Sequence, residues 1–264
     1  MVRPLLVALV LHAGSTAAES LHLAPIGTAV RGSFELGGKS IPLPAGKFVL
    51  AATTVTEPAM LEGDISKPRA KLARVLLVQV ERPRLRAAVL ASVALPPASY
   101  RLNWINHTCK KENVLYRADL ASAKATDEDC LLVDHSLGNF GPRSQGVWKE
   151  AATWLTEQHV ELPVAVLISA HVIRAERWRL VSAWYAFNPR MYGCDAPRSR
   201  SWAESPWNKK HLDGDPQRVR FVDSVTDWGK AVQQHFDQLV AGRPVVMEKA
   251  PAIHSCAAAR ASLD

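Results

Sequence analysis

Alternating apolar and polar positions predict β-strands along much of the chain. Residues 33–36 and 47–55 alternate in this way and predict a β-hairpin with an elaborated turn. Between them, the segment Ile41-Pro42-Leu43-Pro44-Ala45-Gly46 cannot donate a backbone hydrogen bond at either proline, so we expect it to run extended at an edge. Further strands are predicted at residues 74–81, 85–95, 100–105, 114–120, 131–136, 164–172 and 176–187.

Two segments show the spacing of amphipathic helices. Residues 145–159 place apolar side chains on one helical face, which should bury Trp148 and Trp154. A clearer helix begins at Asp215-Pro216, because Asp is a preferred N-cap and Pro suits the first helical position, and it ends at Gly242. Its apolar stripe consists of Phe221, Val222, Val225, Trp228, Val232, Phe236, Leu239 and Val240.

The order of these elements predicts the fold class. Strands dominate, short turns connect them and both helices come late, which indicates an α+β fold with a mainly antiparallel sheet and two principal helices packed on it. The sequence shows neither βαβ alternation nor an internal repeat. We expect a single domain over residues 19–246, followed by a flexible tail over residues 247–264.

The first 18 residues have the three-part form of a secretory signal peptide. Arg3 precedes an apolar run from Leu5 to Leu11, and small residues end the segment at Ala17-Ala18. The apolar run is too short to cross a bilayer, so we expect cleavage after Ala18 and no transmembrane segment in the mature chain. The alternative is a buried N-terminal strand or helix. The leader predicts a periplasmic or secreted protein.

Composition and charge indicate an ordered, basic protein. The chain has 264 residues, of which 48% are hydrophobic and 22% charged, so it can bury a substantial core and is not expected to be disordered. Removing the leader leaves 31 basic and 25 acidic residues, a net charge of +6. An exported protein meets little nucleic acid, so the expected partner is an anionic envelope component or another protein.

All four cysteines lie in the mature chain, and export would permit disulfides. We expect a Cys109–Cys130 disulfide, since its loop of about 20 residues is short enough for the two thiols to meet early. Cys194 and Cys256 are left open, because they lie far apart in the sequence and Cys256 is in the expected tail. Four free thiols are the alternative if the protein is not exported.

From the leader onward, the chain carries in order the segment 41–46, cysteines flanking Val114-Leu115-Tyr116-Arg117, and a helix from Asp215-Pro216 containing Phe221-Val222 and Trp228-Gly229. This order, over most of residues 30–243, resembles a family of uncharacterised exported bacterial proteins. The resemblance implies export and brings no activity with it. A sheet with two helices also looks like the photosystem-accessory-protein type of α/β/α sandwich, which implies a fold but no function.

The sequence contains no assembled catalytic motif. Gly-x-Ser-x-Gly, the nucleophile elbow of serine hydrolases, does not occur. Asp134-His135-Ser136 holds the right residue types, but adjacent strand residues point to opposite faces and should not form a relay. We therefore interpret His135 as a structural or surface histidine rather than a catalytic base.

Metal and nucleotide sites are not indicated either. The histidines are scattered, and the local clusters are His107 near Cys109 and His211 with Asp213 and Asp215. Helix capping and turn formation explain both aspartates without a metal. Neither a phosphate loop nor Gly-x-Gly-x-x-Gly is present, so we expect no cofactor.

Two sets of residues are candidates for ligand binding. Alternation places each of two arginine pairs on one face of its strand, and neighbouring strands would join them into a positive face for an anionic partner; a solvated outer face is the simpler interpretation. Two tryptophans in the polar stretch after residue 188 could stack on a ligand, although anchoring of a long loop is the favoured interpretation. These candidates are Arg84, Arg86, Arg177 and Arg179, and Trp202 and Trp207.

The leading hypothesis is an exported, non-catalytic interaction or ligand-binding protein. It follows from the leader and from the lack of a catalytic signature. The alternative is an exported hydrolase whose site assembles only in three dimensions. A cleft that joins His135 or His171 to a carboxylate and a Ser or Cys would favour the hydrolase.

Overall fold

The computed structural model describes residues 23–56, 71–81, 83–95, 108–120, 127–163, 165–176, 179–243, 245 and 251–256. The expected signal peptide (1–18), the expected strand 100–105 and Arg177 lie outside these residues. Among the described residues, no helix is long and apolar enough to cross a membrane.

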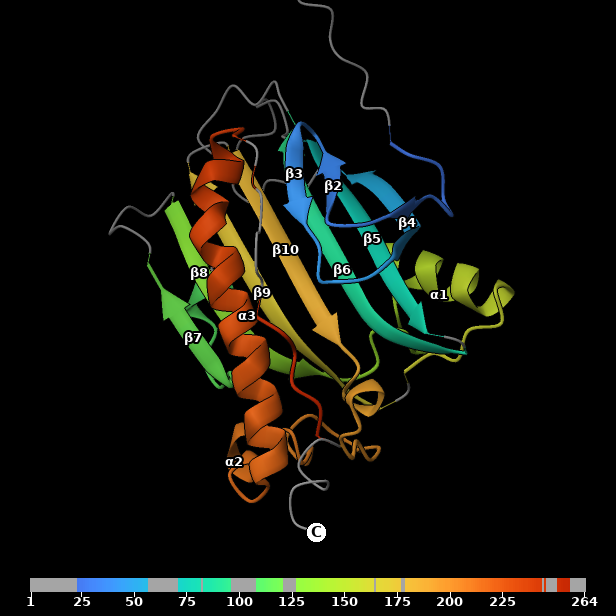
Figure 1. Ribbon diagram of the computed structural model, residues 1–264, viewed down its shortest axis with the longest axis vertical. Helices are drawn as coiled ribbons and strands as arrows, with labels where there is room; N and C mark the ends of the chain where they lie inside the picture. Colours follow the sequence, from blue (N-terminus) through green and yellow to red (C-terminus); the bar gives the residue numbers. More distant parts are fainter. Residues whose placement is uncertain are drawn as a thin grey trace, which may run out of the picture.

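An eight-stranded antiparallel sheet forms the centre of the structure (Figure 1). Its strand order is β1-β4-β5-β6-β10-β9-β8-β7, and the long central strands are joined as hairpins, as the alternation predicts. The expected α+β class with a mainly antiparallel sheet is confirmed. The strands are β1 (Ala29–Val30), β4 (Phe48–Thr56), β5 (Lys71–Glu81), β6 (Arg84–Leu95), β7 (Tyr116–Asp119), β8 (Asp127–Ser136), β9 (Leu167–Glu176) and β10 (Arg179–Phe187).

The N-terminal hairpin differs from the expected one. β2 (Ser33–Leu36) pairs with β3 (Lys39–Pro42), whereas β4 joins the large sheet beside β5. The reason is the Gly37-Gly38 turn, in which both residues have positive φ, 55° and 70°. Two such residues make the tight turn that hairpins favour, so the chain reverses before the prolines rather than after them.

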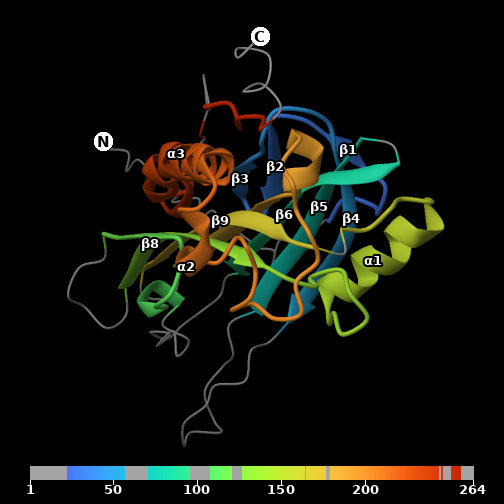
Figure 2. The same cartoon turned by 90° about the horizontal axis from the view of Figure 1, so that it is seen from below.

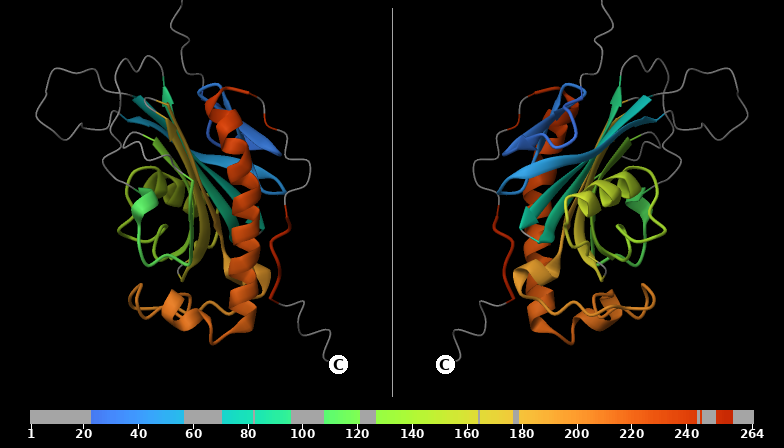
Figure 3. Two further views of the ribbon diagram at one scale, coloured as in Figure 1. Left: turned by 90° about the vertical axis from the view of Figure 1, so that its left-hand side faces the viewer. Right: turned by 90° about the vertical axis from the view of Figure 1, so that its right-hand side faces the viewer.

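Two principal helices cover opposite faces of the sheet (Figures 2 and 3). α3 (Pro216–Val240) lies along β8, β9 and β10, and α1 (Val147–Glu157) packs over β4 and β5. Asp215 caps α3 as expected, because its carboxylate accepts hydrogen bonds from the backbone N–H groups of Gln217 and Arg218 at 2.9 and 3.2 Å. Three short helices complete the structure: η1 (Thr108–Lys110), η2 (Pro189–Tyr192) and α2 (Lys209–Leu212).

α3 supplies most of the helical contribution to the larger core. Every residue of the predicted apolar stripe is buried, and Trp228 packs edge-on against Tyr185 of β10, with ring centroids 4.5 Å apart. In α1, by contrast, the tryptophans are only partly buried, and Ala151 and Leu155 take the buried positions. Trp148 therefore lies at the margin of this face, where its ring meets that of Trp184 of β10 edge-on.

Two disulfides close the fold. Cys109–Cys130, which we call the β8 disulfide, fastens η1 to β8 with its Cα atoms 5.6 Å apart. Cys194–Cys256, which we call the C-terminal disulfide, joins the loop after η2 to the segment 251–256. This segment belongs to the stretch expected to be a flexible tail, and the Cys256 N–H also donates to the Tyr192 carbonyl at 2.8 Å. No described cysteine is free.

Candidate functional site

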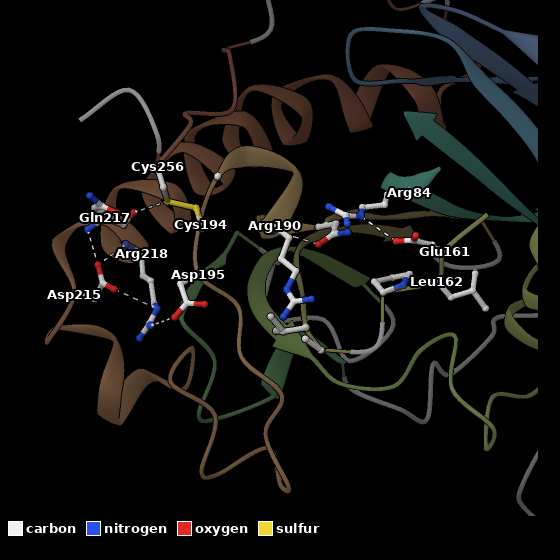
Figure 4. Close-up of a pocket in the computed structure, with 15 residues that line it drawn as sticks. Arg84, Glu161, Leu162, Arg190, Cys194, Asp195, Asp215, Gln217, Arg218 and Cys256 are labelled. Carbon is white, nitrogen blue, oxygen red and sulfur yellow. Dashed lines mark hydrogen bonds and ion pairs between the residues drawn. A yellow bond between two sulfur atoms is a disulfide. The ribbon is translucent and has the colours of Figure 1, made fainter. Parts of the chain in front are cut away.

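A cavity of about 520 Å³ lies where β6 begins, β10 ends and α3 starts (Figure 4). Such a volume is within the usual range of small-molecule sites, roughly 300–1,000 Å³. Three arginines and three carboxylates line it, so we call it the arginine pocket. Its lining residues are Arg84, Glu161, Leu162, Pro163, Ala165, Val166, Asn188, Arg190, Gly193, Cys194, Asp195, Asp215, Gln217, Arg218 and Cys256.

Two of the arginines are committed to carboxylates at the ends of the pocket. Arg84 Nε donates to Glu161 Oε2 at 2.9 Å, and their backbones are bridged by the Leu85 N–H donating to the Glu161 carbonyl. At the other end, Arg218 Nε lies 3.3 Å from Asp215 Oδ2, and its terminal nitrogen lies 4.0 Å from Asp195. The Arg84–Glu161 pair joins segments far apart in the sequence, whereas Arg218 and Asp215 both lie at the start of α3.

Arg190 is held differently. η2 places it: the Asn188 side chain accepts a hydrogen bond from the Arg190 N–H at 3.2 Å, and Gly193 ends the turn with φ 74°. Its Nε donates to the Ala196 carbonyl at 3.2 Å, but no carboxylate among the described residues pairs with its guanidinium. Figure 4 shows its side chain between the Arg84 and Arg218 ion pairs. Its two terminal nitrogens are therefore available to an anion.

The remaining lining is apolar or neutral. Leu162, Pro163, Ala165 and Val166 form one side, and the C-terminal disulfide forms part of another. The amide of Gln217, at the start of α3, makes no side-chain hydrogen bond among the described residues. The pocket thus combines one unpaired cation, neutral hydrogen-bonding capacity and an apolar wall.

The structure does not bring Arg179 beside Arg84 and Arg86. β6 and β10 are neighbours, but they are antiparallel, and Phe187 pairs with Ala87 whereas Val181 pairs with Val93. Arg84 and Arg86 therefore lie at the opposite end of the strand pair from Arg179, roughly 30 Å away at about 3.3 Å per residue.

Each of the two arginines of β6 also forms an ion pair. Arg84 pairs with Glu161 in the arginine pocket. Arg86 pairs with Glu81 at 2.6 Å, and its guanidinium lies over the Tyr192 ring, 4.4 Å from the centroid. Neither guanidinium is thus free to form the expected face.

The two candidate tryptophans anchor their loop. Trp207 is fully buried against Phe221 of α3, with centroids 5.8 Å apart, so it is not an exposed ligand platform. Trp202 is 37% exposed, and its ring stacks on His135 of β8 at 4.9 Å. Its indole N–H donates to the His135 carbonyl at 3.2 Å, and the His135 Nε2 faces the Trp202 carbonyl at 3.1 Å. This reciprocal contact fastens the loop to the sheet.

His135 is consequently engaged in structure. A carbonyl oxygen only accepts hydrogen bonds, so the 3.1 Å contact places a proton on Nε2. Nδ1 lies 3.4 Å from Asp134 Oδ1 and the side chain is fully buried, so a substrate could not reach either nitrogen. The backbone N–H of His135 donates to that same carboxylate oxygen at 2.8 Å. This arrangement agrees with a structural histidine.

A second set of polar residues, Lys111, Asp134 and His171, lies on the sheet face opposite α3. Lys111 Nζ donates to Asp134 Oδ2 at 2.5 Å. Burial alone would raise the pKa of Asp134, but hydrogen bonds from His135 and Lys111, with the Lys111 charge, bring it below its usual value. His171 lies opposite Leu132 in the strand register, and burial, with the Lys111 charge, lowers its pKa to about 4.

These groups do not assemble a hydrolytic relay. The Ser169 hydroxyl donates to the backbone carbonyl of Asp134 at 3.3 Å, so it is not directed at a histidine. In the described part of the chain, no hydrogen bond joins His171 to a carboxylate or a serine. All four cysteines are disulfide-bonded. The geometry that would favour the hydrolase is therefore absent among the described residues.

The second histidine cluster considered for a metal is also explained by local structure. Asp215 caps α3, and His211 Nε2 lies 3.2 Å from the Ala203 carbonyl. Within the described residues, no group of three or more His, Cys, Asp or Glu side chains is arranged to hold a metal ion.

Comparison with protein-family models, curated proteins and solved structures finds no match. An architecture of this kind assigns no activity, because one fold supports many unrelated functions. Arg190, the residue that distinguishes the pocket, was not among the sequence candidates. The only local signal for it is the Asn188-Pro189 start of a capped turn, which predicts the turn but not what surrounds it.

Proposed function

We propose that the protein is an exported, non-catalytic ligand-binding protein that holds a small carboxylate- or phosphate-bearing molecule in the arginine pocket. The observation that carries this proposal is Arg190: it lines a cavity of about 520 Å³ and has no carboxylate partner among the described residues. The other two arginines of the pocket are already paired.

The chemistry of Arg190 suits an anionic group. A guanidinium presents parallel N–H donors that match the two oxygens of a carboxylate or phosphate, and such charge-assisted bonds are stronger than neutral ones. Because Nε is already fixed on the Ala196 carbonyl, the side chain is oriented before a ligand arrives. Preorganisation of this kind reduces the entropy lost on binding.

The lining favours binding over hydrolysis. Among the described residues, neither a serine nor a histidine lines the pocket, and both of its cysteines form the C-terminal disulfide, so this lining offers no activated nucleophile. Two of its carboxylates, Glu161 and Asp215, are engaged with arginines. The pocket therefore offers recognition groups in place of a nucleophile and base.

Export is the second part of the proposal. Residues 1–18 have the pattern of a secretory signal, and the structure contains two disulfides, which persist in oxidising compartments. We expect the mature chain to begin near Glu19 in the periplasm or outside the cell. Mass mapping of the N-terminus of protein isolated from its host tests this; retention of Met1 in the functional form would contradict export.

Titration calorimetry tests the binding proposal. Purified mature chain is titrated with 4-methylpentanoate, succinate and inorganic phosphate, first with the native protein and then with an Arg190→Gln variant. We expect at least one anion to bind and the variant to weaken it roughly ten-fold or more, as loss of a charge-assisted contact would. Arg198→Gln, which removes an exposed arginine of the same loop outside the pocket lining, should leave binding unchanged. Equal affinities of native protein and Arg190→Gln would refute the assignment.

A further inference from the structure

We infer that the ligand of the arginine pocket is a zwitterion of the amino-acid class, a free amino acid or a short peptide, whose carboxylate binds Arg190 and whose ammonium group binds Asp195. This inference rests on the proposed function, because it names the ligand class for the same pocket. Its basis is the unequal use of the three carboxylates that line the cavity.

Glu161 and Asp215 already pair with arginines. Glu161 accepts the 2.9 Å hydrogen bond from Arg84. Asp215 caps α3 by accepting from two backbone N–H groups, and its other oxygen lies 3.3 Å from Arg218. Replacing either residue's partners with a ligand would break an ion pair or uncap the longest helix. Neither carboxylate is thus suited to receive a cationic group.

Asp195 is the carboxylate with free capacity. Its side chain is 80% exposed, and its one ion-pair contact among the described residues is the 4.0 Å approach to Arg218. Such a distance is too long for a direct hydrogen bond. An ammonium group entering the pocket could therefore pair with Asp195 without displacing an existing hydrogen bond.

Arg190 and Asp195 are close enough for one small ligand to reach both. The guanidinium of Arg190 bonds to the carbonyl of Ala196, the residue that directly follows Asp195. In Figure 4 Asp195 is drawn between Arg218 and Arg190, with its carboxylate directed toward Arg218. A cation and an anion side by side are complementary to a molecule that carries the opposite charges the same short distance apart.

The rest of the lining agrees with this ligand class. The described lining contains three arginines and three carboxylates, so a ligand with no net charge keeps these charges balanced, whereas a dianion would add an excess of negative charge. The apolar side formed by Leu162, Pro163, Ala165 and Val166 is available to an aliphatic side chain. Leucine is therefore a suitable probe.

Calorimetry with a matched set of probes tests the inference. Leucine and leucylleucine carry both charges, 4-methylpentanoate lacks the ammonium group of leucine, and 3-methylbutylamine lacks its carboxylate. We expect leucine or leucylleucine to bind at least ten-fold more tightly than 4-methylpentanoate, and 3-methylbutylamine to bind most weakly. Asp195→Asn should abolish the advantage of the zwitterion and leave 4-methylpentanoate affinity unchanged or improved. Asp213→Asn, an exposed acid outside the pocket lining, is the matched control.

The outcomes separate the two proposals. If 4-methylpentanoate binds through Arg190 as tightly as the zwitterions do, the zwitterion inference is wrong and the anion-binding proposal stands. If the zwitterions bind more tightly but keep their advantage in Asp195→Asn, the role of Asp195 is wrong. If none of the probes binds, the proposed function itself is contradicted. Thermal melting of each variant checks that the substitution leaves the fold intact.

Discussion

Gly229 marks the closest approach of α3 to the sheet, and a methyl group there should destabilise the protein. A Cβ at this position would lie 3.0 Å from the Cβ of Ala170 on β9 and 2.8 Å from a methyl carbon of Leu131 on β8. Carbon atoms in ordinary contact are about 3.5–4.0 Å apart. Because Ala170 and Leu131 are fully buried, neither has solvent-facing space into which to move.

Two opposing effects determine the sign for Gly229→Ala. Alanine is favoured over glycine in a helix by about 1 kcal/mol, whereas overpacking a close-packed core costs roughly 1–3 kcal/mol. The Ala170 Cβ is fixed to the backbone of a strand paired on both sides, so the contact is relieved mainly by moving α3 outward. We expect the cost to exceed the gain and the free energy of unfolding to fall by about 1 kcal/mol.

Urea unfolding at fixed pH, with both disulfides intact, measures this change. A double variant that combines Gly229→Ala with Ala170→Gly restores the space by removing the opposing methyl group. Its total cost should be smaller than the sum of the two single costs by about 1 kcal/mol, the coupling expected of residues in contact. If Gly229→Ala instead raises stability by about 1 kcal/mol, as it would at an exposed helical site, the close-contact reasoning is wrong.

Three further predictions concern the disulfides and the loop and sheet polar groups. Replacing both cysteines by serine should cost roughly 4 kcal/mol at the C-terminal disulfide, which spans 62 residues, and roughly 3 kcal/mol at the β8 disulfide, which spans 21; a reversed order in denaturant unfolding would refute the loop-entropy argument. Trp202→Ala should cost roughly 1–3 kcal/mol, because it removes a stacked ring and a hydrogen bond to His135; an unchanged urea midpoint would show that the loop is anchored elsewhere. The folded-state pKa of His171, about 4, is below the unfolded value of 6.5, so its contribution to stability is present above pH 6.5 and is lost as the pH falls toward 4. Between pH 7 and pH 5 the native protein should therefore lose roughly 2 kcal/mol more than a His171→Gln variant, and parallel pH profiles would contradict this.

Local sequence patterns predicted the helices and strands well, because caps, turns and residue spacing act over short stretches of the chain. The ends of α3 follow from Asp215-Pro216 and Gly242, and its buried face follows from helical spacing. Strand pairing was predicted less reliably, since it depends on which turn closes first. The Gly37-Gly38 turn, with both φ angles positive, pairs β2 with β3 and leaves β4 to the large sheet.

The arrangement of the candidate binding residues depends on something else. Alternation predicts Arg84 and Arg86 on one face of a strand, but only the antiparallel register shows that Arg179 lies at the far end of its neighbour. Trp207 lies in a polar stretch of sequence, yet the loop folds back and buries it against Phe221. Both outcomes depend on contacts between distant parts of the chain, which composition and periodicity do not contain.

The same dependence explains why Arg190 was missed. Arg190 is distinguished by having no carboxylate partner among the described residues, whereas Arg84 pairs with Glu161 of a distant segment and Arg218 pairs with Asp215 at the same helix start. The sequence contains Arg190 but does not show which carboxylate pairs with which arginine. These pairings depend on the fold, which brings the start of β6, the end of β10 and the start of α3 together at one pocket.

The positions of the disulfides connect the two parts of the proposed function. The β8 disulfide lies away from the arginine pocket, whereas both cysteines of the C-terminal disulfide line it. The C-terminal disulfide joins Cys194, which lies between Arg190 of η2 and Asp195, to Cys256 beside the start of α3. A reducing compartment would not maintain this bond. The proposed binding at Arg190 and the proposed export are thus linked through this bond.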